Sequence, residues 1–279
     1  MNQEEQQEVK QQKRQLTKTE KKVVIIMAVA AVIAVAIFAA VMYINDYYKA
    51  TEKAQEAIRG NELVKVIETE DYYLFSKDGG LLSILDMGKD KGIIFYPGGK
   101  VDEVAYAPLL LELAEKGYDV YLVKMPAKLA ILGKDKADAI IAGDASIKEW
   151  TMMGHSLGGA MAATYTAEND DKIDNLVLLA AYSLDDLTQA DVDVYSFYGS
   201  EDKVLNMEKY QECLSNLPSD KVENMIEGGN HAYFGNYGEQ DGDGTATITR
   251  DEQQETVLDI FLTEEVKETV TNGLGDLFK

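Results

Sequence analysis

Residues 154–158 carry the side chain in this sequence that is best suited to nucleophilic chemistry. They read Gly-His-Ser-Leu-Gly and match G-x-S-x-G, in which the serine lies on a sharp turn between a strand and a helix. An apolar segment, 150–153, precedes the pattern, and an alanine-rich segment follows it. The alternative is an ordinary glycine-rich turn, so the prediction depends on partners for the serine. With them, Ser156 would be the nucleophile of an acyl-transfer reaction.

Two histidines are available as the base for this serine, His155 and His231. Consecutive residues on a sharp turn point in different directions, so His155 cannot place its ring on the Ser156 hydroxyl. We expect His155 to pack under the turn as a supporting residue. His231 follows an apolar segment and lies close to Gly228 and Gly229, in a loop where a core histidine is unusual. His231 is therefore the predicted base.

An acid that could orient this histidine follows another apolar segment, 193–199. Asp202 lies three residues after Gly199, which ends that segment, and Glu201 is the nearby competitor. An acid just past the end of a strand lies at the carboxyl edge of a parallel sheet, where open α/β folds place their sites. Asp202 is the predicted acid.

The elements that must position these three side chains alternate between strand and helix after residue 60. This alternation predicts an α/β fold, a mostly parallel sheet covered by helices on both faces. The expected strands are 64–70, 72–76, 92–99, 118–126, 150–154, 175–183, 193–200 and 221–229. The expected helices are 103–117, 136–144, 157–169, 206–217 and 250–270.

The chain order Ser156, Asp202, His231 is the order of the triad in the α/β-hydrolase superfamily. Residues 92–262 resemble that superfamily, and in particular its small, lid-less group related to dienelactone-hydrolase-like proteins. Within them, residues 92–126 resemble the stretch that holds the third strand, the oxyanion loop, the first helix and the fourth strand. The resemblance implies an α/β-hydrolase fold and a serine hydrolase, esterase- or lipase-like, that needs no cofactor.

The same resemblance implies an oxyanion hole made of two backbone N–H groups. Tyr96-Pro97 stands where the family usually has His-Gly, which is a departure from the pattern. By this alignment the donors are the N–H groups of Gly98 and Leu157, with Gly99 in place of Gly98 if the register slips by one residue. Pro97 is excluded because proline has no N–H group.

A segment of different composition, residues 23–44, precedes the α/β region. It contains no charged residue, glycine or proline, and as a helix it would be about 33 Å long. This length crosses the hydrocarbon core of a bilayer, about 30 Å thick, whereas the apolar region of a cleaved signal peptide is usually shorter. A buried core helix is the other alternative. We predict a transmembrane helix that serves as a signal anchor.

The charges on either side of this helix predict its orientation. Six lysines and arginines precede it, and the next 15 residues hold three, mixed with acids. The positive-inside rule then gives a cytoplasmic tail, 1–22, the transmembrane helix, 23–44, a helical stalk, 45–60, and an extracytoplasmic hydrolase domain, 61–279. The protein is thus expected in the membrane as a single-pass protein.

Composition excludes several other classes of protein. The net charge is −22, which makes nucleic acid an unfavourable partner because phosphate binding requires a basic patch. One cysteine, Cys213, forms no disulfide within the chain and supplies no zinc cluster. Residues 241–252 resemble a calcium loop, but Arg250 stands where a ligand is needed, so we expect no metal.

Three functions remain compatible with these residues. The first is a membrane-anchored serine hydrolase that cleaves an ester-type bond of a small acyl-ester substrate. The second is a non-catalytic α/β-hydrolase-like module for binding or scaffolding. The third is an acyltransferase that uses the same triad, with an alcohol in place of water. The sequence does not identify the acyl group, the leaving group or the oligomeric state.

Overall fold

The computed structural model describes residues 17–77 and 90–277 and divides into two units, Met1–Asp46 and Tyr47–Lys279. The first unit contains helix α2 (Lys18–Asn45). Thr17 caps this helix: its hydroxyl accepts a hydrogen bond from the N–H of Glu20, whose side chain accepts from the N–H of Thr17. None of the side chains of α2 is buried, and its apolar window has a mean hydropathy of 3.1. Helix α2 is therefore long and apolar enough to cross a membrane.

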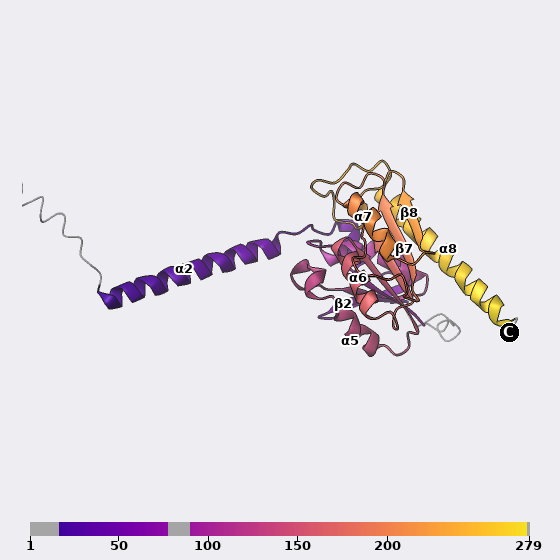
Figure 1. The fold of residues 1–279 in the computed structure, drawn as a ribbon, viewed down its shortest axis with the longest axis horizontal. Coiled ribbons are helices and arrows are strands. Elements are labelled where there is room, and N and C mark those ends of the chain that lie inside the picture. The colour runs from indigo at the N-terminus through magenta and orange to yellow at the C-terminus, as the bar shows by residue number, and fades with distance from the viewer. Residues whose placement is uncertain (1–16, 78–89, 278–279) are drawn as a thin grey trace, which may run out of the picture. The chain divides into compact units, whose positions relative to one another are not determined.

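The second unit is built on an eight-stranded sheet, seen in part behind the helices in Figure 1. Its spatial order is β1-β2-β4-β3-β5-β6-β7-β8, and the pairs β1/β2 and β2/β4 are antiparallel while all the others are parallel. The strands are β1 (Val64–Glu68), β2 (Tyr72–Lys77), β3 (Lys91–Tyr96), β4 (Asp119–Val123), β5 (Glu149–His155), β6 (Asn175–Leu179), β7 (Asp193–Gly199) and β8 (Val222–Ile226). The mostly parallel α/β fold expected from the sequence is confirmed.

Helices cover both faces of this sheet. They are α3 (Glu52–Ala57), α4 (Ala107–Glu115), α5 (Lys136–Gly143), α6 (Leu157–Glu168), α7 (Met207–Cys213) and α8 (Arg250–Leu277). Short 3-10 turns connect them: η2 (Glu103–Tyr106), η3 (Pro126–Lys128), η4 (Ala130–Leu132), η5 (Leu214–Asn216) and η6 (Ala232–Phe234). These elements follow the segments expected from the hydrophobic pattern, with ends that differ by a few residues.

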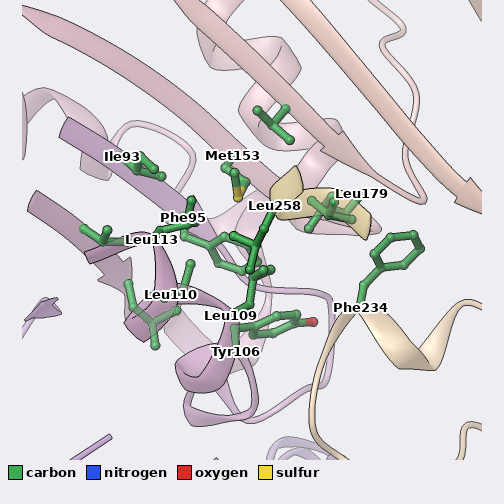
Figure 2. Packing of buried hydrophobic residues seen from close by; sticks show 14 of the residues in the cluster. Ile93, Phe95, Tyr106, Leu109, Leu110, Leu113, Met153, Leu179, Phe234 and Leu258 are labelled. Atoms are coloured by element: carbon green, nitrogen blue, oxygen red, sulfur yellow. The ribbon is translucent and has the colours of Figure 1, made fainter. Parts of the chain in front are cut away.

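Each face of the sheet has its own hydrophobic core, because alternate side chains of a strand point to opposite sides. On the first face Phe95 of β3 and Met153 of β5 pack against α4 and α8, as Figure 2 shows for Leu109, Leu113 and Leu258. These side chains are buried. The core of this face lies directly beneath the carboxyl edge of β3 and β5.

On the second face the neighbouring residues of the same strands pack against α5 and α6. Trp150, the tryptophan of the chain, is buried there on β5, with its ring 5.7 Å from that of Tyr121 on β4. Its indole lies so close to Gly92 of β3 that a Cβ at this glycine would stand 2.5 Å from the ring. β5, which ends beside the candidate nucleophile, is thus fixed from both faces.

The segment 45–60 differs from the helical stalk that the sequence suggested. Only Glu52–Ala57 is helical, and residues from Tyr47 onward belong to the second compact unit. Ala54 is fully buried, and Ala57 and Ile58 pack against the core of the first face. The physical reason is that these apolar residues recur at helical spacing and form a face that is stabilised by burial on the domain.

Candidate active site

Ser156 lies at the tip of the turn between β5 and α6. Its backbone has φ 52° and ψ −123°, a conformation that is costly for a residue with a side chain and that clusters at functional sites. A Cβ at Gly154 would meet the carbonyl carbon of Gly158 at 2.6 Å, and one at Gly158 would meet the carbonyl oxygen of Tyr96 at 2.1 Å. Glycine is required at both positions because the strand, the helix and β3 approach so closely.

His231 and Asp202 come together at the same edge of the sheet, after β8 and β7. The Nδ1 atom of His231 lies 2.8 Å from Oδ2 of Asp202, and both side chains are buried. The other oxygen of this carboxylate, Oδ1, accepts hydrogen bonds from the N–H groups of Val204 and Leu205, at 2.8 Å each. The carboxylate is therefore held in one orientation, and Nδ1 of the imidazole is the nitrogen that faces it.

Two glycines allow this approach of the acid loop to the histidine loop. A Cβ at Gly199 would stand 2.3 Å from the carbonyl carbon of Gly229, so the two loops are in backbone contact. Glu201, the competing acid, contributes only its backbone N–H to this region, and that group donates a hydrogen bond to the carbonyl of Gly229. Asp202 is the acid that faces the histidine.

His155 is buried and lies directly beside His231, with 4.6 Å between the two ring centroids. Because His155 precedes Ser156 on the turn, this contact brings His231 to the turn that carries Ser156. The hydroxyl of Tyr106 lies 2.7 Å from Nδ1 of His155, and the N–H of Gly98 donates to the same hydroxyl at 3.0 Å. Because the hydroxyl oxygen accepts from Gly98, the hydroxyl proton is donated to Nδ1 of His155. A neutral His155 then carries its own ring proton on Nε2.

This network changes the assignment of the oxyanion donor. The N–H of Gly98, expected to face the substrate, is instead bonded to the buried hydroxyl of Tyr106. The physical reason is that Gly98 lies against Tyr106 and His155, both within 2.8 Å of where its Cβ would be. The next residue, Gly99, lies against the side chain of Leu157 and has no acceptor for its N–H among the described residues. Of the two alternatives that the sequence left open, Gly99 is therefore the better candidate donor.

The N–H of Leu157, the second expected donor, begins helix α6. The first N–H groups of a helix have no acceptor within it, and the earliest intrahelical bond here is from Ala160 to the carbonyl of Ser156. Such a helix N-terminus stabilises negative charge. The two N–H groups thus belong to residues in contact, Leu157 at the start of α6 and Gly99 in the loop after β3.

Polar side chains to which the sequence assigned no role at the site support the histidine loop. Oδ2 of Asp243 accepts from the N–H of Ala232 at 2.9 Å, and Gln253 of α8 bonds both the N–H and the carbonyl of Asn230. The roles of Tyr106, Asp243 and Gln253 at the site could not be inferred locally, because they depend on partners far along the chain. The bonds of Asp243 to backbone N–H groups give this residue of the calcium-like segment a structural role.

The pKa of His155 lies well below its usual value. Burial is the largest cause and repulsion from His231 adds to it, while a hydrogen bond with the backbone of His231 acts in the opposite sense. The folded protein therefore holds His155 neutral, whereas an unfolded histidine takes up a proton below about pH 6.5. As the pH falls below that value, protons bind preferentially to the unfolded chain. The contribution of this residue to stability is present above about pH 6.5 and is lost on acidification.

We expect the replacement His155→Asn to remove this part of the pH dependence. Between pH 7.5 and 5, the free energy of unfolding of the unsubstituted protein should fall more steeply than that of the variant, by up to about 1.4 kcal/mol per pH unit. Urea unfolding followed by circular dichroism at several pH values gives both curves. A difference between the two proteins that is constant with pH would contradict the burial of a neutral imidazole.

Replacing Tyr106 with phenylalanine should leave two buried groups unpaired, the N–H of Gly98 and Nδ1 of His155. Each such group costs about 1–3 kcal/mol, so Tyr106→Phe should lower the free energy of unfolding by at least that amount. Tyr165→Phe is the matched control, because the hydroxyl of Tyr165 bonds only to Asp138, an exposed carboxylate that water can solvate. Equal losses in urea unfolding of the two variants would contradict the network.

The fold and the geometry at its carboxyl edge define an α/β protein with a serine at a strand-to-helix turn and a buried histidine–aspartate pair beside it. Residues 92–255 match the family model described as the alpha/beta hydrolase family, and this match covers more than half of the sequence. The chain therefore belongs to the α/β hydrolase family. The comparison with curated proteins gives no match.

Solved hydrolase structures have the same fold. A structure described as a predicted CIB-like hydrolase from Thermoplasma acidophilum is 15% identical with a TM-score of 0.50, over 71% of this chain and 96% of that one. Esterase 2 of Thermogutta terrifontis with bound propionate is 15% identical with a TM-score of 0.51, over 77% and 97%. The same esterase phosphoramylated by tabun is 13% identical with a TM-score of 0.50, over 73% and 95%. At these identities the likeness concerns the fold.

Proposed function

We propose that this protein is a membrane-anchored serine hydrolase that cleaves an ester-type bond. The observation that carries the proposal is the convergence at one edge of the sheet of Ser156, on a strained turn, with the buried pair of His231 and Asp202. A strained nucleophile turn and a histidine fixed by a carboxylate are the two requirements of a serine triad. Membership of the α/β hydrolase family supports the same conclusion.

The proposed reaction is acyl transfer in two steps. His231 takes the proton of Ser156 as its oxygen attacks the carbonyl carbon, and Asp202 stabilises the imidazolium that forms. The oxyanion accepts hydrogen bonds from the N–H groups of Gly99 and Leu157. The imidazolium then protonates the departing alcohol, and water, activated by the same histidine, releases the acid from the acyl-enzyme.

The proposed substrate is a small acyl ester. The support comes from the esterase of Thermogutta terrifontis, of which the structure with propionate bound has the same fold. The acyl-enzyme is common to hydrolases and acyltransferases, so the acceptor decides between them. Incubating the protein with a short ester in water containing a small alcohol separates the two, because a transferase yields mainly the new ester and a hydrolase mainly the free acid.

We propose further that α2 holds the protein in the membrane, with the N-terminus in the cytoplasm and the catalytic domain outside. The support is the exposed apolar surface of this helix and the excess of basic residues before it. Residues 45–279 hold 21 basic and 45 acidic residues, so the negative charge belongs to the catalytic part of the chain. Carbonate-washed membranes should retain the protein, and protease added to intact cells should reach the catalytic domain.

Labelling with a fluorophosphonate probe tests the catalytic proposal most directly. The probe phosphylates an activated serine, and mass spectrometry of the digested protein identifies which residue carries the label. Label at Ser156, together with hydrolysis of a short-chain ester, supports the hydrolase. A folded protein that takes no label and hydrolyses no ester would instead be a non-catalytic member of the family.

A further inference from the structure

The first residues of the second unit contact the loop that carries the candidate oxyanion donor. Residues 47–51, here called the strap, follow Asp46, the C-cap of α2, and they lie upstream of residues 92–255, the part of the chain that matches the family model. Tyr48 of the strap forms a parallel β-bridge with Val101. The strap is thus paired with the segment that follows β3.

Two hydrogen bonds make this bridge. The N–H of Tyr48 donates to the carbonyl of Lys100 at 2.8 Å, and the N–H of Asp102 donates to the carbonyl of Tyr48 at 2.9 Å. Gly99, the candidate oxyanion donor, is the residue immediately before Lys100. A shift of the Lys100 carbonyl would therefore turn the neighbouring peptide groups and with them the N–H of Gly99.

The loop between them has a backbone conformation that needs such support. Lys100 has φ 60°, which is unfavourable for a residue with a Cβ and persists only where surrounding contacts impose it. On its other side the N–H of Lys100 donates to the carbonyl of Lys128 at 2.8 Å, and Lys128 itself has φ 57°. The strained peptide is thus held between two contacts, the strap and the turn at Lys128.

The side chain of Lys128 connects the same two contacts. Its ammonium group forms ion pairs with Asp102 and Glu103, and it lies 5.0 Å from the centre of the Tyr47 ring in the strap. Burial lowers the pKa of this lysine, but its pairing with Glu103 and Asp102 outweighs burial and raises the pKa overall. Lys128 is therefore a fixed cation that ties the strap to the residues after the oxyanion loop.

The strap also contacts the loop that follows His231. The N–H of Thr51 donates to the carbonyl of Asn236 at 2.8 Å, and the hydroxyl of Tyr48 accepts from the N–H of Asp241 at 3.2 Å. The rings of Tyr48 and Tyr237 lie 5.6 Å apart. The strap is thus bonded on one side to the oxyanion loop and on the other to the loop that carries the base.

We propose that the strap is a positioning element of the active site, and that Tyr48 holds the Gly99 N–H in register for the oxyanion. This inference rests on the hydrolase function proposed above. Among the residues that the structure describes, the strap makes no contact with Ser156 or His231, so it acts through the oxyanion loop. Its loss should lower stabilisation of the transition state while leaving the binding of the ester in its ground state almost unchanged.

The test compares three substitutions of Tyr48 in the full-length protein in detergent. Tyr48→Phe keeps the ring and the β-bridge and removes the hydroxyl. Tyr48→Ala also removes the ring, but its N–H still donates to the carbonyl of Lys100. Tyr48→Pro removes the side chain and the N–H together, so the ratio of proline to alanine isolates the bond from this N–H to the carbonyl of Lys100, one of the two hydrogen bonds of the β-bridge.

We expect kcat to fall in the order Phe, Ala, Pro, with the proline variant about ten- to hundredfold below the alanine variant and KM within about twofold. A boronic acid that adds to Ser156 mimics the tetrahedral intermediate, and its inhibition constant should rise as kcat falls across the three variants. A purely structural role would instead reduce the folded fraction, measured by circular dichroism and by titration of active sites, and leave kcat per active site unchanged.

Equal kcat per active site in the alanine and proline variants would overturn the proposal. If the proline variant does not fold, the comparison passes to the other two: the alanine variant should have at least threefold lower kcat than the phenylalanine variant at equal KM, and equality overturns the proposal. Unsubstituted protein that neither hydrolyses esters nor takes the probe would show failure of the proposed function, and the strap proposal falls with it.

Discussion

Replacing Ser156 with alanine is expected to abolish probe labelling and to lower kcat for ester hydrolysis by on the order of 10⁶-fold. The substitution removes the atom that forms the acyl-enzyme, and water attacking directly has no comparable activation. The fold should be retained, because the turn is imposed by the glycines on either side and by the hydrogen bond from the N–H of residue 156 to the carbonyl of Leu179. Initial rates with a short-chain nitrophenyl ester measure the effect.

Ser215→Ala is the matched control for this experiment. Ser215 lies on η5, is exposed, and its hydroxyl bonds only to the carbonyl of Glu212 near the end of α7. This variant should keep the full rate and the full labelling. Residual labelling of the Ser156 variant at a rate close to that of the unsubstituted protein would mean that another residue is the nucleophile.

Asp202→Asn should lower kcat by about 10⁴-fold, through the tautomer of His231. Oδ1 of Asp202 accepts hydrogen bonds from the N–H groups of Val204 and Leu205. The carbonyl oxygen of an asparagine is favoured in the same place, because its amide nitrogen could not accept those bonds. Its amide nitrogen then faces Nδ1 of His231, which must become the acceptor. The proton of the neutral ring moves to Nε2, and the histidine can no longer take the proton of the serine.

Glu201→Gln is the control for Asp202→Asn, since it removes the neighbouring negative charge without touching the histidine. It should leave kcat within about threefold of the starting value, as expected for an acid outside the site. A loss in this control as large as that in Asp202→Asn would show that the negative charge of the region, rather than the contact with His231, supports the reaction. His231→Ala should give a loss at least as large as that of Asp202→Asn.

The hydrophobic pattern was sufficient to predict the sheet and the side chains near its carboxyl edge. Buried strands such as β5 and β7 lie in largely apolar segments that reach a glycine, Gly154 or Gly199, and a residue suited to catalysis, Ser156 or Asp202, follows within three positions. The order of the strands fixes the rest, because parallel neighbours bring their carboxyl ends to one edge. The approach of His231 to Asp202 follows once β7 and β8 are neighbours in the sheet.

Features that depend on contacts between distant segments could not be predicted in the same way. The hydroxyl of Tyr106 engages the N–H of Gly98 and so favours Gly99 as the candidate oxyanion donor, and nothing near Tyr106 in the sequence signals that bond. The segment 45–60, which contains the strap, was predicted as a helical stalk for a related reason. The charged residues of this segment suit a solvated helix, whereas the pairing of Tyr48 with Val101 is a backbone interaction that no side-chain pattern encodes.

Trp150 gives the protein an internal optical reporter of the strand that carries the nucleophile. It is the chain's one tryptophan, it lies on β5 six residues before Ser156, and its indole is packed between Gly92 and the ring of Tyr121. Fluorescence excited at the red edge of the absorption band avoids the many tyrosines and reports this single environment. A variant whose emission spectrum is unchanged has kept the packing of β5, so a loss of rate in that variant can be assigned to chemistry without any added label.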